Sequence, residues 1–147
     1  MVHIPPKPKN DAEFLEVMAK IIFISGFRWN VVESRWPKMR KAFHNFNVQK
    51  VAGERVESLM KKEGMIKNSG KIAAITGNAK ICRELIREHG SIAKWVKKMQ
   101  KTNKNDPLLS QSVAEAFQEK FAKIGAMTSK WLAYVATRDR TLLRHDD

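Results

Sequence analysis

A glycine turn between two lysines is the part of this sequence whose residue types best suit the binding of an anion. Lys123 and Lys130 flank the segment 125–127, Gly-Ala-Met, and helix-forming residues continue on both sides. Two helices joined by so short a turn form a helical hairpin. The tip of such a hairpin presents backbone N–H groups at the positive end of a helix dipole, which suits a phosphate. The same pattern also fits a structural corner between core helices.

The ends of the two hairpin helices follow from capping preferences. We expect the first helix to end at Ile124, with Gly125 in the left-handed backbone conformation that follows many helices. Either Thr128 or Ser129 then caps the second helix by accepting a backbone N–H. The residues predicted to contact the anionic partner are Gly125, Met127, Thr128, Ser129 and Lys130.

Three acidic residues follow the second helix of the hairpin: Asp139, Asp146 and Asp147. Arginines are interspersed among them, and these nearby cations should keep the carboxyl groups ionised. An ionised carboxylate stabilises positive charge that develops in a reaction and can orient an attacking water. The same residues also fit a frayed acidic tail, because chain ends are often poorly held.

The composition indicates one domain with a polyanionic partner. The chain has 147 residues, and 28 Lys plus Arg against 15 Asp plus Glu give a net charge of +13. This length is enough for a hydrophobic core. The basic excess favours nucleic acid as the partner first and an anionic membrane surface second.

Several other classes of protein are not indicated. No apolar run approaches the roughly 18 residues of a membrane span, and the N-terminus lacks the apolar core of a signal peptide. We therefore expect a cytoplasmic, nucleoid-associated protein without a membrane partner. A lone cysteine, Cys82, lies on the expected inner face of a helix and fits a reducing compartment. The Cys and the four scattered His show no metal-ligand spacing, so we expect no metal and no cofactor.

The spacing of apolar residues predicts an all-α fold, a compact bundle of about eight or nine short helices with the hairpin near the C-terminus. Residues 1–9 are Pro-rich and basic and are predicted to form an extended arm, while residues 10–147 form a single domain. The helices are expected at residues 10–24, from 27 and again from 36 to 46, at 47–52, 56–60 and 71–89, from 91 to about 100, from 112 to 124 and from 128 onward.

Several segments, in order along the chain, carry a resemblance to a known family. They are Gly-Phe-Arg-Trp at 26–29, Arg-Lys-Ala-Phe-His-Asn-Phe at 40–46, Val-Glu-Ser-Leu at 56–59, Gly-Met-Ile-Lys-Asn-Ser-Gly-Lys-Ile at 64–72 and Asn-Ala at 78–79. With the hairpin, they make the chain resemble 3-methyladenine DNA glycosylase I, a branch of the helix-hairpin-helix DNA glycosylases. The resemblance implies a repair enzyme that hydrolyses the N-glycosidic bond of an alkylated, 3-methyladenine-like base flipped out of duplex DNA.

The resemblance also assigns roles to particular residues. Gly26 and Phe27 match the turn that presses into the DNA, and Trp29 matches the tryptophan of the base pocket. An indole face attracts a cationic base by about 0.5 to 2 kcal/mol, which an ordinary adenine does not receive. Asp146 is the candidate for the catalytic aspartate, ahead of the other two acids. For Trp29 the alternative is an ordinary core position.

Lys130 falls where lyase-competent relatives place the amine that attacks the sugar as a Schiff base. Such an amine needs a lowered pKa, which exposure to solvent opposes. A lysine that binds phosphate, or one that is merely solvated, is therefore favoured over a nucleophile at Lys130.

Three departures from the family pattern bear on activity. The glutamate with which the family reads the alkylated base aligns with Ile21, and the Cys and His residues that bind zinc in many members are absent. Relatives also continue past Asp147, so we expect a C-terminally shortened member, acting as a monomer. Two alternatives stay open: a non-catalytic helix-hairpin-helix DNA-binding protein derived from the same fold, and an RNA-binding or partner-interaction protein.

Overall fold

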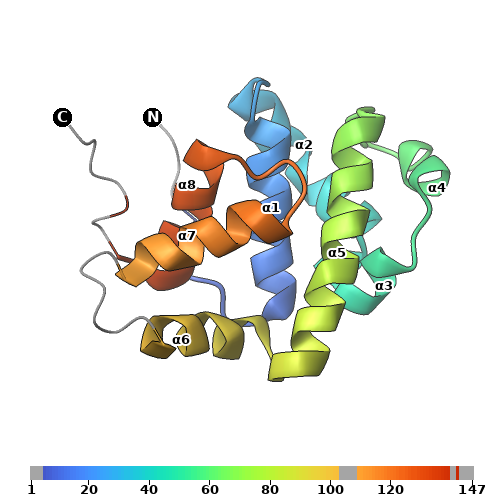
Figure 1. Cartoon of the computed structure of the whole chain (residues 1–147). Coiled ribbons are helices and arrows are strands. Elements are labelled where there is room, and N and C mark those ends of the chain that lie inside the picture. The colour runs from blue at the N-terminus through green and yellow to red at the C-terminus, as the bar shows by residue number, and fades with distance from the viewer. Residues whose placement is uncertain (1–4, 103–108, 140–141, 143–147) are drawn as a thin grey trace.

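The computed structural model describes residues 5–102, 109–139 and 142, and within them every regular element is a helix (Figure 1). This confirms the predicted all-α fold. None of the helices in these ranges is long and apolar enough to cross a membrane. The elements are α1 (Asp11–Ile24), α2 (Trp29–Ala42), the 3₁₀ helix η1 (His44–Phe46), α3 (Val48–Ala52), α4 (Val56–Met60), α5 (Ser69–His89), α6 (Ile92–Thr102), α7 (Leu109–Lys120) and α8 (Ala126–Thr137).

Helix α1 is the centre of the bundle. Eight of its 14 residues are buried, whereas a helix at the surface of a globular protein usually buries a single stripe. Burial over so much of its circumference requires neighbours on several sides. In Figure 1, α1 runs through the middle of the molecule, with α3, α4 and α5 on one side and α6, α7 and α8 on the other.

Aromatic contacts fix both ends of α1. At its C-terminal end, the ring of Phe23 lies 6.4 Å from the rings of Trp36 and Phe43, in edge-on geometry. At its N-terminal end, the ring of Phe14 lies 5.5 Å from that of Phe117 in α7. Such pairs contribute about 0.5 to 1.5 kcal/mol beyond the burial of their area. The position of the α1 C-terminus, where the candidate site begins, is therefore well determined.

Three asparagines set the starts of helices. The side chains of Asn10, Asn47 and Asn68 each accept the backbone N–H three residues further on, at 2.9 to 3.1 Å. A cap of this kind is worth about 1 kcal/mol. Those at Asn10 and Asn47 confirm the predicted helix starts, whereas the cap at Asn68 starts α5 at Ser69, two residues earlier than the predicted residue 71.

Pro37 lies inside α2, where a new helix was predicted to begin. Because α2 runs unbroken, the predicted start at Trp36 and Pro37 is wrong. A proline removes one helical N–H and crowds the carbonyl four residues earlier. That cost is offset by packing, since Val32, Trp36 and Met39 of α2 are all buried.

Cys82 is completely buried in α5, on the inner face that the sequence predicted. Burial, aided by the negative charge of Asp11, raises the pKa of the thiol to about 12. Because the thiolate is the reacting form, we expect a thiol reagent at mildly alkaline pH to modify the native protein about 100-fold or more slowly than a free cysteine. A colorimetric thiol assay with and without denaturant measures this. Equal rates in the two conditions would contradict the burial.

Candidate nucleic-acid interface

One end of the molecule gathers the turns that the sequence assigned to DNA. The C-terminal end of α1 and the N-terminal ends of α5 and α8 all point to the top of the view in Figure 1. Among the described residues, three large hydrophobic side chains are exposed: Phe27 and Trp29 at 47% each and Met127 at 81%. They lie where α1 passes into α2 and in the first turn of α8. Exposed rings grouped with cations are typical of surfaces that take up nucleic acid bases.

Residues 25–28, between α1 and α2, are called the wedge turn here. Gly26 has a φ of +71°, a conformation that favours glycine. The N–H of Phe27 donates to the carbonyl of Ile24 at 2.9 Å. This tight turn leaves the Phe27 ring half exposed, and an exposed ring on a tight turn is suited to enter the gap left by an extruded nucleotide.

Lys71 of α5 holds the wedge turn in place. Its Nζ donates to the carbonyl oxygens of Phe23 at 2.9 Å and of Ser25 at 2.6 Å. The same Nζ lies 5.7 Å from the centre of the Phe27 ring. Burial lowers the pKa of Lys71, and the positive charge of Lys123 lowers it further. Sequence reasoning missed this role, because the contacts join residues more than 40 positions apart.

Trp29 opens α2 and is half exposed, so it does not occupy a core position. The core tryptophan of α2 is Trp36, whose indole N–H donates to Glu16 Oε2 at 2.8 Å. The exposed indole of Trp29 lies directly after the wedge turn in the chain. Its aromatic surface is therefore available beside the turn that carries Phe27.

The hairpin joins α7 to α8 through residues 121–125, called the hairpin turn here, and its ends differ from the prediction. Helix α7 ends four residues before Ile124, and α8 begins about two residues before the predicted start. The left-handed residue is Lys123, with a φ of +57°, and not Gly125, whose φ is −94°. The early exit from α7 lets the side chain of Ile124 turn into the core, where it is buried.

The first turn of α8 defines what the hairpin can offer a phosphate. Gly125 is the N-cap of α8 and is exposed, although its N–H is taken by Thr128 Oγ1 at 2.8 Å. Ser129 is 2% exposed, and both its N–H and its hydroxyl donate to backbone carbonyls of the same turn. Ser129 therefore has no donor left for DNA. Met127 is highly exposed and Lys130 is half buried.

Asn78 of α5 fastens the hairpin turn from inside. Its side chain is fully buried. Its Oδ1 accepts the N–H of Ala122 at 2.7 Å, and its Nδ2 donates to the carbonyl of the same residue at 3.1 Å. Sequence reasoning included Asn78 only within a family-like segment. The available signal was a polar residue on the apolar inner face of a long helix, since such a residue needs a partner.

Three lysines near the two turns, Lys71, Lys123 and Lys130, form no ion pair with a carboxylate of the described residues. Positive charge that is not paired within the protein attracts a polyanion and raises its association rate. The electrostatics and the exposed rings therefore mark the same end of the bundle.

Of the three candidate acids, only Asp139 lies among the described residues. Asp146 and Asp147 lie outside the described residues. Asp139 follows α8, and its backbone N–H donates to Thr137 Oγ1 at 3.1 Å. A 12-residue helix such as α8 is about 18 Å long, so Asp139 lies at the end of α8 remote from Gly125. Within the described ranges, no group of three or more His, Cys, Asp or Glu could hold a metal ion.

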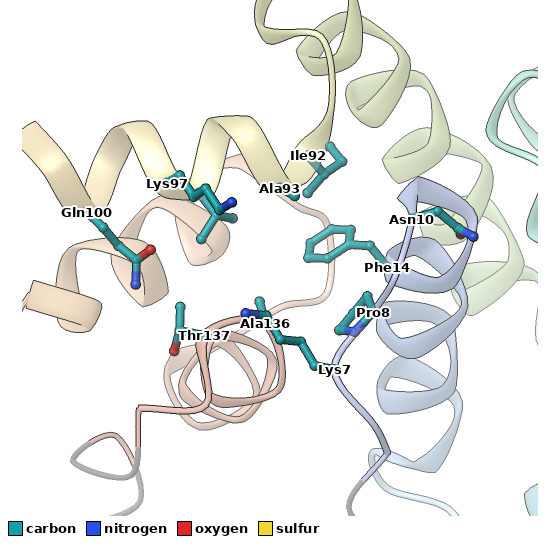
Figure 2. A pocket seen from close by; sticks show the side chains of 11 residues that line it. Lys7, Pro8, Asn10, Phe14, Ile92, Ala93, Lys97, Gln100, Ala136 and Thr137 are labelled. Carbon is teal, nitrogen blue, oxygen red and sulfur yellow. The ribbon is translucent and has the colours of Figure 1, made fainter.

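A cavity of about 90 Å³ lies at the opposite end of the bundle (Figure 2). It opens where α1 begins and α8 ends, whereas the wedge turn follows the other end of α1. The cavity therefore does not belong to the interface. Its lining residues are Lys7, Pro8, Asn10, Phe14, Ile92, Ala93, Val96, Lys97, Gln100, Ala136 and Thr137.

Comparisons with known proteins identify a family and similar folds. A family model described as methyladenine glycosylase matches residues 6–132. The 3-methyladenine DNA glycosylase I of Staphylococcus aureus matches with a TM-score of 0.71 at 16% identity, over 99% of this chain and 89% of that one. A solution structure of 3-methyladenine DNA glycosylase I matches with a TM-score of 0.66 at 23% identity, over 90% of this chain and 78% of that one. A crystal structure of 3-methyladenine DNA glycosylase I matches with a TM-score of 0.68 at 22% identity, over 89% of this chain and 80% of that one. At these identities the structural matches establish the fold.

Proposed function

Because this chain belongs to the methyladenine glycosylase family, we propose that it hydrolyses the N-glycosidic bond of an alkylated, 3-methyladenine-like base flipped out of duplex DNA. The family places the protein among the DNA glycosylases of base excision repair. The observation that carries the proposal for this chain is the grouping of Phe27, Trp29 and Met127 at one positively charged end of the bundle. A surface of this kind offers base-stacking groups and phosphate-binding groups together.

In this proposal the two turns have separate tasks. The hairpin turn binds the backbone of one DNA strand, and Phe27 of the wedge turn fills the space left by the extruded nucleotide. Trp29 then receives the base. Extrusion costs a few kcal/mol and is easiest for a damaged base, and the indole adds attraction only when the base is cationic. Both effects favour alkylated bases over normal ones.

Cleavage itself needs a negative charge near the anomeric carbon. When the bond between C1′ and the base nitrogen breaks, the electron pair leaves with the base, so a cationic alkylated base departs neutral and positive charge builds on the sugar. Water then bonds to C1′ and loses a proton, which leaves a free base and an abasic site. We assign Asp146 to stabilise the sugar cation and to orient this water.

Ile21 limits how the base can be read. It stands where the resemblance places a base-reading glutamate, and it is 7% exposed in α1. An isoleucine side chain neither donates nor accepts a hydrogen bond. Selection in this chain therefore depends on the cationic character of the base, and we expect 7-methylguanine to be released as well as 3-methyladenine.

The direct test is release of free base from methylated duplex DNA, measured by chromatography against a control without enzyme. We expect 3-methyladenine and 7-methylguanine to appear faster than by spontaneous loss, with no release of unmodified adenine. Release no faster than the control would reject the enzymatic proposal. Salt-sensitive binding without release would instead indicate the non-catalytic DNA-binding protein, an alternative that the family match does not favour.

The substitution Trp29→Ala tests the assigned base contact. We expect kcat/KM for an alkylated base to fall about two- to thirty-fold, the range that a lost cation–π contact gives. Thermal stability should change little, because the indole is half exposed. Trp29→Phe should retain part of the activity, since a phenyl ring keeps a weaker attraction. Unchanged kcat/KM in Trp29→Ala would remove Trp29 from the base pocket.

We also propose that the protein acts as a monomer on nucleoid DNA in the cytoplasm. The net charge of +13 supports association with DNA before any lesion is found. Light scattering of the purified protein should give the mass of one chain. A stable dimer would contradict this part of the proposal.

A further inference from the structure

Lys71 and Lys123 bring two ammonium groups together between the wedge turn and the hairpin turn. Lys123 reaches from the hairpin turn across the first turn of α5. Its Cε and Nζ lie 3.6 and 3.8 Å from the position that a Cβ on Gly70 would take, and Lys71 is the next residue of α5. Burial is the larger cause of the lowered pKa of Lys71, and the charge of Lys123 is the second. The two ammonium groups therefore act on each other electrostatically.

These two lysines have the charge and the donors to bind an anion. Like charges at short range repel each other, and among the described residues neither lysine forms an ion pair with a carboxylate. Lys71 donates to two carbonyl oxygens, and an ammonium group has three N–H donors, so one donor remains for a ligand. Lys123 is exposed in a left-handed conformation that lysine rarely adopts. The fold thus holds it in an unfavourable backbone geometry beside a second cation.

We propose that Lys71 and Lys123 jointly bind one backbone phosphate of the DNA strand that passes between the wedge turn and the hairpin turn. This inference rests on the proposed function, because it requires both turns to face DNA. A phosphodiester carries one negative charge and two exposed oxygens, one for each lysine. A phosphate held there lies beside the ring of Phe27, whose centre is 5.7 Å from Lys71 Nζ. It would therefore fix the strand next to the point where the ring enters the base stack.

The salt dependence of binding tests the shared phosphate. The full-length protein is titrated with a duplex that carries an uncleavable abasic-site analogue, over a range of salt concentrations. Losing one phosphate contact makes the negative slope of log K against log salt less steep by about one unit. We expect the double variant of Lys71→Gln and Lys123→Gln to make the slope about one unit less steep. Lys123→Gln alone should make it less steep by a measurable part of that unit, because Lys71 still reaches the phosphate. Lys80→Gln, an exposed position in the same helix, is the matched control and should leave the slope unchanged.

Two results of this titration would overturn the inference. If Lys123→Gln leaves the slope as in the wild type, the hairpin lysine contacts no phosphate. If the double variant makes the slope about two units less steep, the two lysines hold separate phosphates. Because Lys71 also supports the wedge turn, Lys123→Gln carries the test when Lys71→Gln fails to fold.

The titration of Lys71 itself gives a second readout. Its ammonium signal is followed by NMR against pH in the wild-type protein, with Lys71→Arg used for assignment. A bound phosphate favours the charged form, so the pKa of Lys71 should rise when the duplex is added. No rise would overturn the inference. An equal rise with inorganic phosphate alone would make the pair a site for free anions and overturn its assignment to the DNA backbone.

Neither measurement requires turnover. If the wild type releases no base but the slopes change as expected, the proposed enzymatic function fails and the phosphate site stands. If base release is normal and the slopes do not change, only the phosphate site is rejected.

Discussion

Asp146→Asn should lower the rate constant for base release by about 100-fold or more. An asparagine keeps the size of the side chain but removes the negative charge that stabilises the sugar cation, and the loss of one such preorganised group typically has an effect of this order. Binding to the uncleavable abasic duplex should stay the same or become tighter, because a negative charge near the DNA is removed. Single-turnover base release and duplex titration measure the two quantities separately.

Two neighbouring acids supply matched controls for this substitution. Asp147→Asn and Asp139→Asn each remove one negative charge from the same region of the chain, so they reproduce any general electrostatic effect on DNA binding. We expect both to release base at nearly the wild-type rate. If Asp139→Asn or Asp147→Asn is the variant that loses activity, the catalytic role moves to that residue. If all three keep full activity, cleavage does not depend on this segment.

Asn78→Leu should both destabilise the protein and weaken its hold on DNA. A leucine of similar size leaves the N–H and the carbonyl of Ala122 without the partner that Asn78 gives them. A lost partner for a buried polar group costs about 1 to 3 kcal/mol, and because Ala122 is exposed, water recovers part of it. The hairpin turn then loses its fixed position, so we expect the Kd for the abasic duplex to rise about tenfold. Denaturant unfolding and duplex titration measure these effects.

Thr76→Val is the control for Asn78→Leu. Thr76 is also buried in α5, but its hydroxyl donates only to a carbonyl of its own helix, that of Ala73. Its replacement should leave the Kd for DNA close to wild type even if stability falls slightly. A rise in Kd in both variants would mean that general loosening of α5, and not release of the hairpin turn, weakens binding.

The parts of the fold that depend on neighbouring residues were predictable from the sequence. Asn10 and Asn47 cap helices because each is followed by residues whose N–H groups lie within its reach, and a local pattern contains that information. The all-α class and the order of the helices follow in the same way from the spacing of apolar residues. The family resemblance, carried by short segments in sequence order, is confirmed by the family match over residues 6–132.

The predictions that were wrong or missing concern contacts between residues far apart in the sequence. Pro37 is a local signal for a helix start, yet the burial of Trp36 and Met39 keeps α2 continuous. Gly125 is the residue that local preference assigns to the left-handed conformation, whereas the structure uses Lys123. The partners of Lys71 and Asn78 lie more than 40 positions away. No pattern within a window of a few residues records them.

Helix α5 carries contacts that hold both the wedge turn and the hairpin turn. Lys71 supports the wedge turn and Asn78 supports the hairpin turn, and the two side chains are seven residues apart, which places them on the same side of the helix about 10 Å from each other. Two turns of one helix thus set the distance between the support of the wedge turn and the support of the hairpin turn. Inserting a single residue between them would rotate one support by about 100° relative to the other. Related sequences should therefore keep the number of residues between these two positions constant.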